Sequence, residues 1–188
     1  MQKRVILIFI LCMFCTGCSK TDEPFYDLVR ESELIEMNTK SDILLLQGYH
    51  MVKVTIHPTQ YYREEEAIAI IKEYCEQEES LYDYEAPPEG CVWEAVKYTL
   101  SYKQNDMFDP YVNIKLVDIN GMELCLEGKS YTKRTHDILI SSKEQDGMIW
   151  KELYCYYVVP QECISYALEF GDGTIYNDEE SVYYVIRR

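Results

Sequence analysis

The chain has 188 residues, of which 33 are acidic and 18 are basic, and its formal net charge at neutral pH is −15. A charge of this sign and size repels phosphate backbones and anionic lipid headgroups, so nucleic acid is excluded as the expected partner. The length suits one domain with a full hydrophobic core. An acidic surface of this kind also tolerates a cationic ligand, although it is more often a means of solubility.

The N-terminus has the residue order of an export signal. Lys3 and Arg4 precede an apolar run, Val5–Phe14, which is followed by small residues. A transmembrane helix needs roughly 20 apolar residues, about twice the length of this run. We therefore expect residues 1–17 to form a signal helix that is removed on export, rather than a permanent membrane span.

The end of this signal resembles a bacterial lipobox. Thr16 and Gly17 are small enough to admit a peptidase to the backbone, and Cys18 offers the thiol that would carry a diacylglyceryl group. Cys15 stands where leucine is usual in that pattern. The resemblance implies a protein anchored through Cys18 to the cell membrane and facing the extracellular side. The alternative is an ordinary signal peptide with an incidental cysteine.

The segment that follows is polar and acidic, with scattered apolar residues. We expect residues 18–47 to be a spacer between the membrane and the domain, with a short helix around Leu28–Met37. The domain is then expected to span residues 48–188.

Alternating apolar and polar residues predict strands along most of this domain. The runs are Met51–His57, Val92–Lys103, Tyr111–Asp118, Asp137–Ser142, Met148–Val159, Cys163–Phe170 and Ser181–Arg187. Asn120-Gly121 stands between two alternating runs and indicates a tight hairpin turn. We expect about eight short strands, whose apolar faces must be buried against one another, so the predicted fold is a mainly all-β antiparallel sandwich.

One stretch has helical spacing instead. Between residues 63 and 78, apolar residues recur every three or four positions, and Glu64, Glu65 and Glu66 suit the positive end of a helix dipole. Pro87-Pro88 follows and cannot continue a helix. We therefore expect one helix, inserted between strands.

The cysteines beyond Cys18 are Cys75, Cys91, Cys125, Cys155 and Cys163. Export permits disulfides, although their pairing cannot be deduced from the sequence. We consider a bond between Cys75 and Cys91, because these two bracket a polar loop. The alternative is that both are small apolar fillers.

Several landmarks resemble a family of lipid-anchored lipoproteins of Gram-positive bacteria. They are Pro88-Glu89-Gly90 with Trp93, Asp118-Ile119-Asn120-Gly121, and Val159-Pro160, within roughly residues 48–188. That family has an immunoglobulin-like sandwich, related in fold to immunoprotective extracellular antigens, and no assigned function. The resemblance implies the fold and no catalytic residue.

The sequence contains three groups of residues with the chemistry of a reactive or metal-binding site. Ser130–Lys133 matches the S-x-x-K of penicillin-binding enzymes but lacks its companion motifs. Cys163 and His57 could form a dyad only if the fold brought them together. Phe170–Glu180 collects carboxylates that calcium would accept, without EF-hand spacing. No histidine or cysteine spacing supports zinc, so we expect no metal, no cofactor and no catalytic residue.

The 18 tyrosines are the most unusual feature of the composition. Tyr154 and Tyr156 alternate with Tyr157, and Tyr183 is followed by Tyr184, so both faces of these strands carry rings. Because both faces cannot be core, we expect some rings to be exposed, and exposed tyrosine often contacts proteins or sugars. Tyr154, Tyr156 and Tyr183 are the candidate binding residues.

Two functional hypotheses follow. The first is a non-catalytic, lipid-anchored envelope lipoprotein that binds a protein, a peptide or a cell-wall glycan. The second is an envelope hydrolase whose cysteine or serine site is assembled only in the fold.

Overall fold

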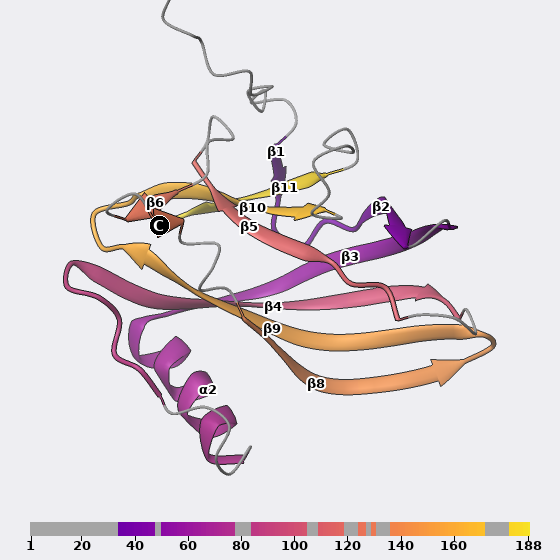
Figure 1. Cartoon of the computed structure of the whole chain (residues 1–188), viewed down its shortest axis with the longest axis horizontal. Coiled ribbons are helices and arrows are strands. Elements are labelled where there is room, and N and C mark those ends of the chain that lie inside the picture. Colours follow the sequence, from indigo (N-terminus) through magenta and orange to yellow (C-terminus); the bar gives the residue numbers. More distant parts are fainter. Residues whose placement is uncertain are drawn as a thin grey trace, which may run out of the picture.

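The computed structural model describes residues 34–47, 50–77, 84–104, 109–118, 124–126, 129–130, 136–171 and 181–188. These residues form two β-sheets packed as a sandwich, with one helix on the outside (Figure 1). The mainly all-β sandwich with one inserted helix is thus confirmed. The expected signal helix and Cys18 lie outside the described residues. Within the described part of the chain, no helix has the length and hydropathy needed to cross a membrane.

The sheets differ in size and are called the small and the large sheet. The small sheet has the order β1 (Leu34–Glu36), β11 (Val182–Arg187), β10 (Ser165–Gly171), β5 (Asn113–Val117). The large sheet has the order β2 (Ser41–Gln47), β3 (His50–Arg63), β4 (Cys91–Lys103), β9 (Met148–Pro160), β8 (His136–Gln145). All pairs are antiparallel except β1 with β11. A separate ribbon joins β6 (Cys125–Leu126) to β7 (Lys129–Ser130).

The domain begins earlier than expected. β1 pairs with the last described strand of the small sheet, and β2 forms an edge of the large sheet. The predicted spacer and the predicted helix up to Met37 are therefore wrong for residues 34–47. In β2, Ile43 and Leu45 are buried while Leu44 and Leu46 are exposed. Three consecutive leucines hid this alternation in the sequence.

The core lies between the inner faces of the two sheets. On β4, the residues from Val96 to Tyr102 that face inward are buried and those between them are only partly buried, as alternation predicts. Aromatic rings join the sheets, since Tyr98 of the large sheet packs edge-on against Phe170, and Phe170 packs against Tyr184, with centroids 5.4 and 5.5 Å apart. Offset and edge contacts of this kind are the favoured aromatic geometry.

The predicted helix is confirmed as α2 (Glu64–Gln77). It packs beside the start of β4, on the outer face of the large sheet (Figure 1). There the alternation of β4 stops, because Trp93 and Ala95 on the outer side are buried, as are the inward-facing Glu94 and Val96. The large sheet is therefore covered on both faces at this end.

Turn residues fix the β8–β9 hairpin. Asp146 and Gly147 join β8 to β9 with φ of 53° and 71°, which is the backbone that an Asp-Gly turn of type I′ requires. The expected turn at Asn120-Gly121 lies outside the described residues. Beside it, the Leu124 amide donates a hydrogen bond to the Leu116 carbonyl at 2.9 Å.

Candidate functional site

The three tyrosines expected to bind a ligand do not form one site. Tyr154 lies on β9 of the large sheet, whereas Tyr183 lies on β11 of the small sheet, opposite Glu169 in the register. Tyr184, the neighbour of Tyr183, is the one that enters the core. Tyr154 and Tyr183 therefore stand on the outer faces of different sheets, and both are partly buried.

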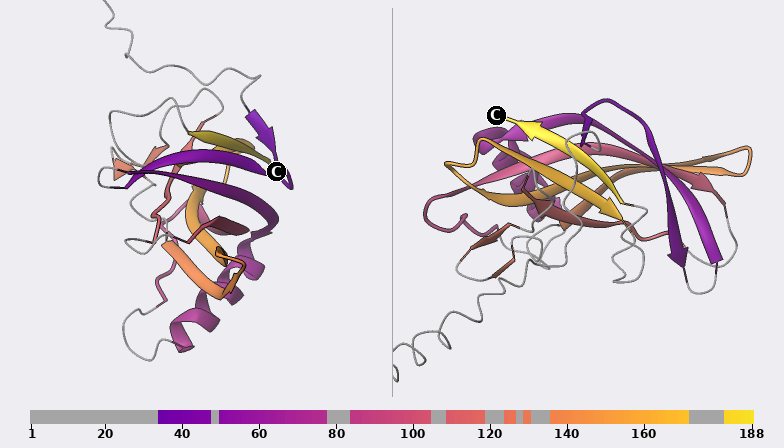
Figure 2. Two further views of the ribbon diagram at one scale, coloured as in Figure 1. Left: turned by 90° about the vertical axis from the view of Figure 1, so that its right-hand side faces the viewer. Right: turned by 90° about the horizontal axis from the view of Figure 1, so that it is seen from above.

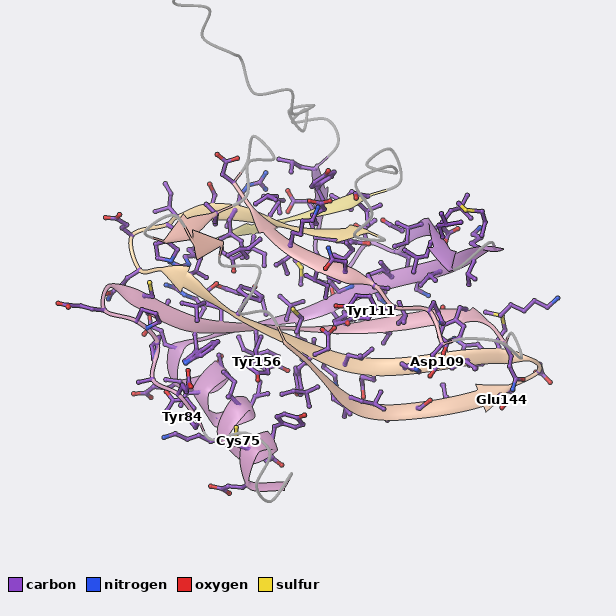
Figure 3. The ribbon with its side chains drawn as sticks, in the orientation of Figure 1. Cys75, Tyr84, Asp109, Tyr111, Glu144 and Tyr156 are labelled. Atoms are coloured by element: carbon purple, nitrogen blue, oxygen red, sulfur yellow. The ribbon has the colours of Figure 1, made fainter. Side chains whose placement is uncertain are left out.

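Tyr156 is not exposed, which corrects the expectation that it contacts a partner. Only 7% of the residue is accessible, and its ring packs edge-on against Trp93 at 5.6 Å. Figure 3 shows Tyr156 between β9 and α2, at the helix-covered end of the large sheet. The assumption that only one face of β9 could be core failed because α2 provides a second layer.

Beyond α2, the outer face of the large sheet carries partly exposed aromatic and charged side chains. Tyr62 and Tyr154 pack edge-on with ring centroids 5.7 Å apart. The Lys143 ammonium lies 5.5 Å from the centre of the Trp150 ring, and Lys97 pairs with Glu152 at 2.8 Å. We call this surface the outer aromatic face and define it by Tyr62, Lys97, Trp150, Glu152 and Tyr154. It combines aromatic rings with a pair of opposite charges.

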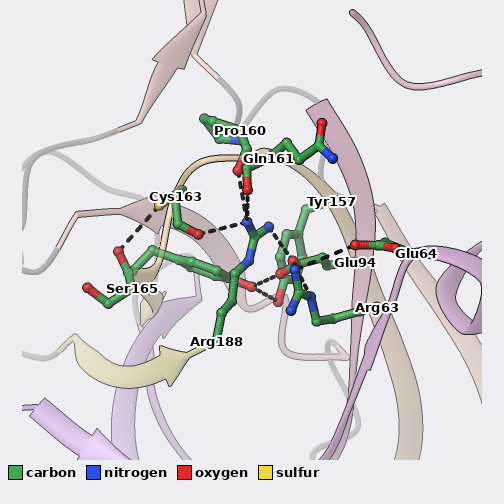
Figure 4. Close-up of polar contacts among 10 residues, drawn as sticks. Arg63, Glu64, Glu94, Tyr157, Pro160, Gln161, Cys163, Ser165 and Arg188 are labelled. Atoms are coloured by element: carbon green, nitrogen blue, oxygen red, sulfur yellow. Dashed lines mark hydrogen bonds and ion pairs between the residues drawn. The ribbon is translucent and has the colours of Figure 1, made fainter. Parts of the chain in front are cut away.

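A second concentration of polar chemistry is buried between the sheets. Glu94 lies on the inner face of β4 and has no accessible surface. Its carboxylate accepts a hydrogen bond from the Tyr166 hydroxyl and forms an ion pair with Arg188 (Figure 4). The Arg63 Nε lies 3.5 Å from the Glu94 Oε1. We call Arg63, Glu94, Tyr166 and Arg188 the ionic cluster.

Arg188 connects the ionic cluster to the backbone between β9 and β10. Its Nη1 donates to the backbone carbonyl oxygens of Pro160, Gln161 and Cys163 at 2.9, 3.1 and 2.7 Å (Figure 4). Burial opposes the charge of this guanidinium, but the Glu94 carboxylate and nearby tyrosine hydroxyls outweigh it and raise the pKa of Arg188. One side chain thus holds the β9–β10 connection, the large sheet and the end of β11 together.

Tyr166 of the ionic cluster and its neighbour Tyr157 are held neutral. Burial, together with the nearby charge of Glu94, raises the pKa of Tyr157 and Tyr166 well above the ordinary value. The two hydroxyl groups are hydrogen-bonded at 2.9 Å. A general base or nucleophile needs a pKa near the working pH and access to a substrate, and these groups have neither. The geometry therefore assigns the cluster to the stability of the sandwich.

Among the described side chains, the cysteines are free thiols: Cys75, Cys91, Cys155 and Cys163. Cys75 lies on α2 and Cys91 begins β4, and no disulfide joins them, so the bond considered from the sequence is not formed in this structure. Burial raises the pKa of the Cys155 and Cys163 thiols. A raised pKa disfavours the thiolate, which is the reactive form.

The other candidates from the sequence are not assembled. His57 Nε2 lies 3.1 Å from the Asn38 carbonyl oxygen. Cys163 Sγ lies 3.4 Å from the Ser165 carbonyl oxygen. Each of the two side chains is therefore engaged with a backbone group and not with the other member of the dyad. Residues 131–133 of the S-x-x-K motif and residues 172–180 of the acidic loop lie outside the described residues. Among the described residues, no three histidine, cysteine or acidic side chains are grouped as a metal site would require.

Comparisons with known proteins do not extend this picture. No family model matches the chain, and neither a curated protein nor a solved structure matches it. The immunoglobulin-like family resemblance therefore stays a prediction from sequence landmarks.

Proposed function

We propose that the protein is an exported lipoprotein, anchored in the cell membrane through Cys18, whose extracellular sandwich binds a protein, a peptide or a cell-wall glycan without catalysis. The anchor is supported by the order of Lys3-Arg4, the apolar run Val5–Phe14 and Gly17-Cys18. Two or more acyl chains on one residue give stable attachment, because each buried methylene adds about 0.8 kcal/mol.

The observation that carries the binding role is the outer aromatic face. Trp150, Tyr62 and Tyr154 are partly exposed there and are oriented by contacts with neighbouring side chains. Tyrosine and tryptophan give a large contact area at a small cost in conformational entropy, and their rings also stack on the apolar faces of sugars. Lys97 and Glu152 at the same surface offer polar groups for specificity.

The hydrolase alternative has less support. Cys155 is fully buried, and the pKa of both Cys155 and Cys163 is raised, so neither thiol is poised as a nucleophile at neutral pH. Glu94, the fully buried acidic residue, is occupied by Arg188 and Tyr166.

The binding role is tested by capture from cell-envelope extract and by co-sedimentation with purified peptidoglycan. We expect one of the two to bind the wild-type protein, and we expect Trp150→Ala/Tyr154→Ala to weaken that binding by about 2 kcal/mol, roughly thirtyfold. Tyr111→Ala is the matched control, because Tyr111 is 66% exposed and lies two residues before β5 of the small sheet, outside the outer aromatic face. Failure of both baits would contradict the binding role, and equal binding by the double variant would contradict the assigned face.

The anchor is tested separately by metabolic labelling with a fatty acid. Cys18→Ala should abolish incorporation and release the protein from the membrane fraction. The Cys15→Ala variant, three residues away, should still be labelled. Persistent labelling of Cys18→Ala would place the anchor at another residue.

A further inference from the structure

Three exposed apolar side chains gather on the β2–β3 hairpin. Leu44, Leu46 and Met51 are 41%, 40% and 48% exposed. Leu46 and Met51 are directly opposite each other in the register, and Leu44 lies two residues before Leu46, on the same side of β2. The three side chains therefore share one face of the hairpin, and we call them the hairpin patch.

The position of the hairpin leaves this patch accessible. β2 is an edge strand of the large sheet, and α2 covers the opposite end of that sheet (Figure 1). Seen from above, the end of the hairpin bends away from the β8–β9 turn (Figure 2, right). In the register the patch lies on the same face of the large sheet as Trp150, because Leu44 pairs with Lys53, Thr55 pairs with Ser101 and Ser101 pairs with Trp150.

The hairpin is also locally neutral in a strongly acidic chain. Ser41–Gln47 and His50–His57 together contain one acidic residue, Asp42, and one basic residue, Lys53, whose Oδ2 and Nζ atoms pair at 2.6 Å. The whole chain has a formal charge of −15. Anionic lipid headgroups repel acidic surfaces. A neutral apolar patch avoids this repulsion and can therefore approach the headgroups.

The length of the chain between Cys18 and the first strand also favours a membrane as the partner of the hairpin patch. The described structure begins at Leu34 in β1, and β2 follows from Ser41. Fully extended, the chain from Cys18 to Leu34 spans at most about 55 Å, whereas the length of β2 is about 23 Å. A chain tethered at Cys18 therefore enters the fold next to the hairpin and is long enough for the hairpin patch to reach the bilayer.

We propose that the hairpin patch docks on the bilayer that carries the N-terminal lipid, with Leu44, Leu46 and Met51 entering its interfacial region. The inference rests on the proposed lipid anchor and adds a second contact with the same membrane. Docking fixes the orientation of the sandwich, which a spacer alone would leave free.

The test uses the full-length lipidated protein in vesicles of phosphatidylcholine and phosphatidylglycerol with brominated acyl chains. Met51→Trp should be quenched at least about twofold more than Leu139→Trp, because interfacial elements lie about 5–10 Å inside the headgroup boundary. Leu139 is the matched control, since it is 56% exposed on β8, the other edge strand of the large sheet. Leu46→Trp provides a second probe if Met51→Trp fails to fold, and the wild-type signal of Trp93 and Trp150 is subtracted.

Substitutions within the patch sharpen the test. Leu44→Ser/Leu46→Ser should remove most of the quenching of Met51→Trp, whereas Leu139→Ser/Ile140→Ser should leave it unchanged. Equal quenching at positions 51 and 139, or none at either, in protein that floats with the vesicles would overturn docking and leave the anchor intact. Failure of the unsubstituted protein to float would instead contradict the anchor. Shielding of position 51 that depends on protein concentration, without bromine quenching, would identify a second copy as the occupant and overturn lipid docking.

Discussion

Glu94 occupies an inward-facing position of β4 that the alternation of the strand would give to an apolar residue. A carboxylate without accessible surface is costly unless its charge is paired and its oxygens are hydrogen-bonded. Here Arg188 and Arg63 supply the opposite charge, and Tyr166 supplies a hydrogen bond. An ion pair of this kind adds little net stability over an apolar replacement, but losing one partner is expensive.

Replacing Glu94 by glutamine should therefore lower the free energy of unfolding by about 3–5 kcal/mol, because the Arg188 guanidinium would stay buried without its counter-charge. Chemical denaturation monitored by circular dichroism measures this change. Glu94→Leu/Arg188→Met should be less destabilising than the sum of its two single substitutions, since it removes both charges at once. Strict additivity of the two single substitutions would show that the two side chains are not coupled.

Asp137 should make stability depend on pH. Its carboxylate accepts a hydrogen bond from Tyr98 at 3.1 Å and lies beside the buried Cys155 thiol. Burial raises its pKa from 3.8 to about 6, so the folded state favours the protonated acid. The stabilising contribution is complete below pH 3.8 and is lost as the pH rises through about 6.

Asp137→Asn should therefore gain stability relative to the wild type as the pH rises from about 4 to 7, because it removes the charged form and keeps an acceptor for Tyr98. Midpoints of thermal unfolding across this range measure the difference. Asp146→Asn in the β8–β9 turn is the matched control. A difference that is constant with pH would show that Asp137 has the same pKa in both states.

At the scale of the elements, alternation in the sequence predicted the strands that have one face toward the core and the other toward solvent. β8, β9, β10 and β11 are confirmed within a few residues of the expected bounds. β1 and β2 were missed because β1 has only three residues and β2 carries a continuous leucine run. The burial of Tyr156 was missed for a different reason, since a helix that covers a sheet leaves no trace in the alternation of the strand beneath it.

The junction between β3 and α2 contains a strained residue. Glu64 begins the helix directly after Arg63 of β3 and has φ of 46°, a left-handed backbone that costs a residue with a Cβ about 1 kcal/mol. The direct passage from strand to helix imposes this conformation. The exposed Glu64 carboxylate lies 3.6 Å from the Arg63 guanidinium, a weak surface contact that offsets little of this cost.

Glu64→Gly should therefore leave the free energy of unfolding unchanged or raise it, whereas Glu64→Val should lower it by about 1 kcal/mol or more, because a β-branched side chain tolerates this backbone least. Denaturant midpoints of the two variants measure the contrast. Glu65→Gly is the control inside the helix, where glycine should destabilise. Should Glu64→Gly prove less stable than Glu64→Val, the left-handed conformation would be contradicted.

At the scale of the molecule, the sandwich could be predicted from the sequence, while the groups inside it could not. The ionic cluster joins β3, β4, β10 and the residue that follows β11. Only Arg63 and Glu94 are neighbours in a strand pairing, and Arg188 reaches Glu94 across the sandwich. The one signal in the sequence was a glutamate at a position of β4 where alternation expects an apolar side chain.

The position of β1 and β2 gives a prediction about the minimal folded unit. β2 buries Ile43 and Leu45 in the core, and β1 closes the edge of the small sheet. Burying side chains of this size contributes about 1.5–3 kcal/mol each, while a whole domain is stable by about 5–15 kcal/mol. If residues 18–33 are the expected spacer, a fragment of residues 34–188 should unfold at the same temperature as the chain that begins at Cys18, measured without lipid.

A fragment of residues 48–188 should behave differently. It would lose both strands and expose the edges of β3 and β11, which are templates for pairing between chains. We expect it to unfold at a lower temperature or to aggregate, and size-exclusion chromatography with thermal unfolding distinguishes these outcomes from a native monomer. The variant Ile43→Ala/Leu45→Ala in the 34–188 fragment separates the two causes, because it removes the core contacts and keeps the strand pairing. If 48–188 matched 34–188 in unfolding temperature, residues 34–47 would have no stabilising role, and the expected spacer would extend to residue 47 after all.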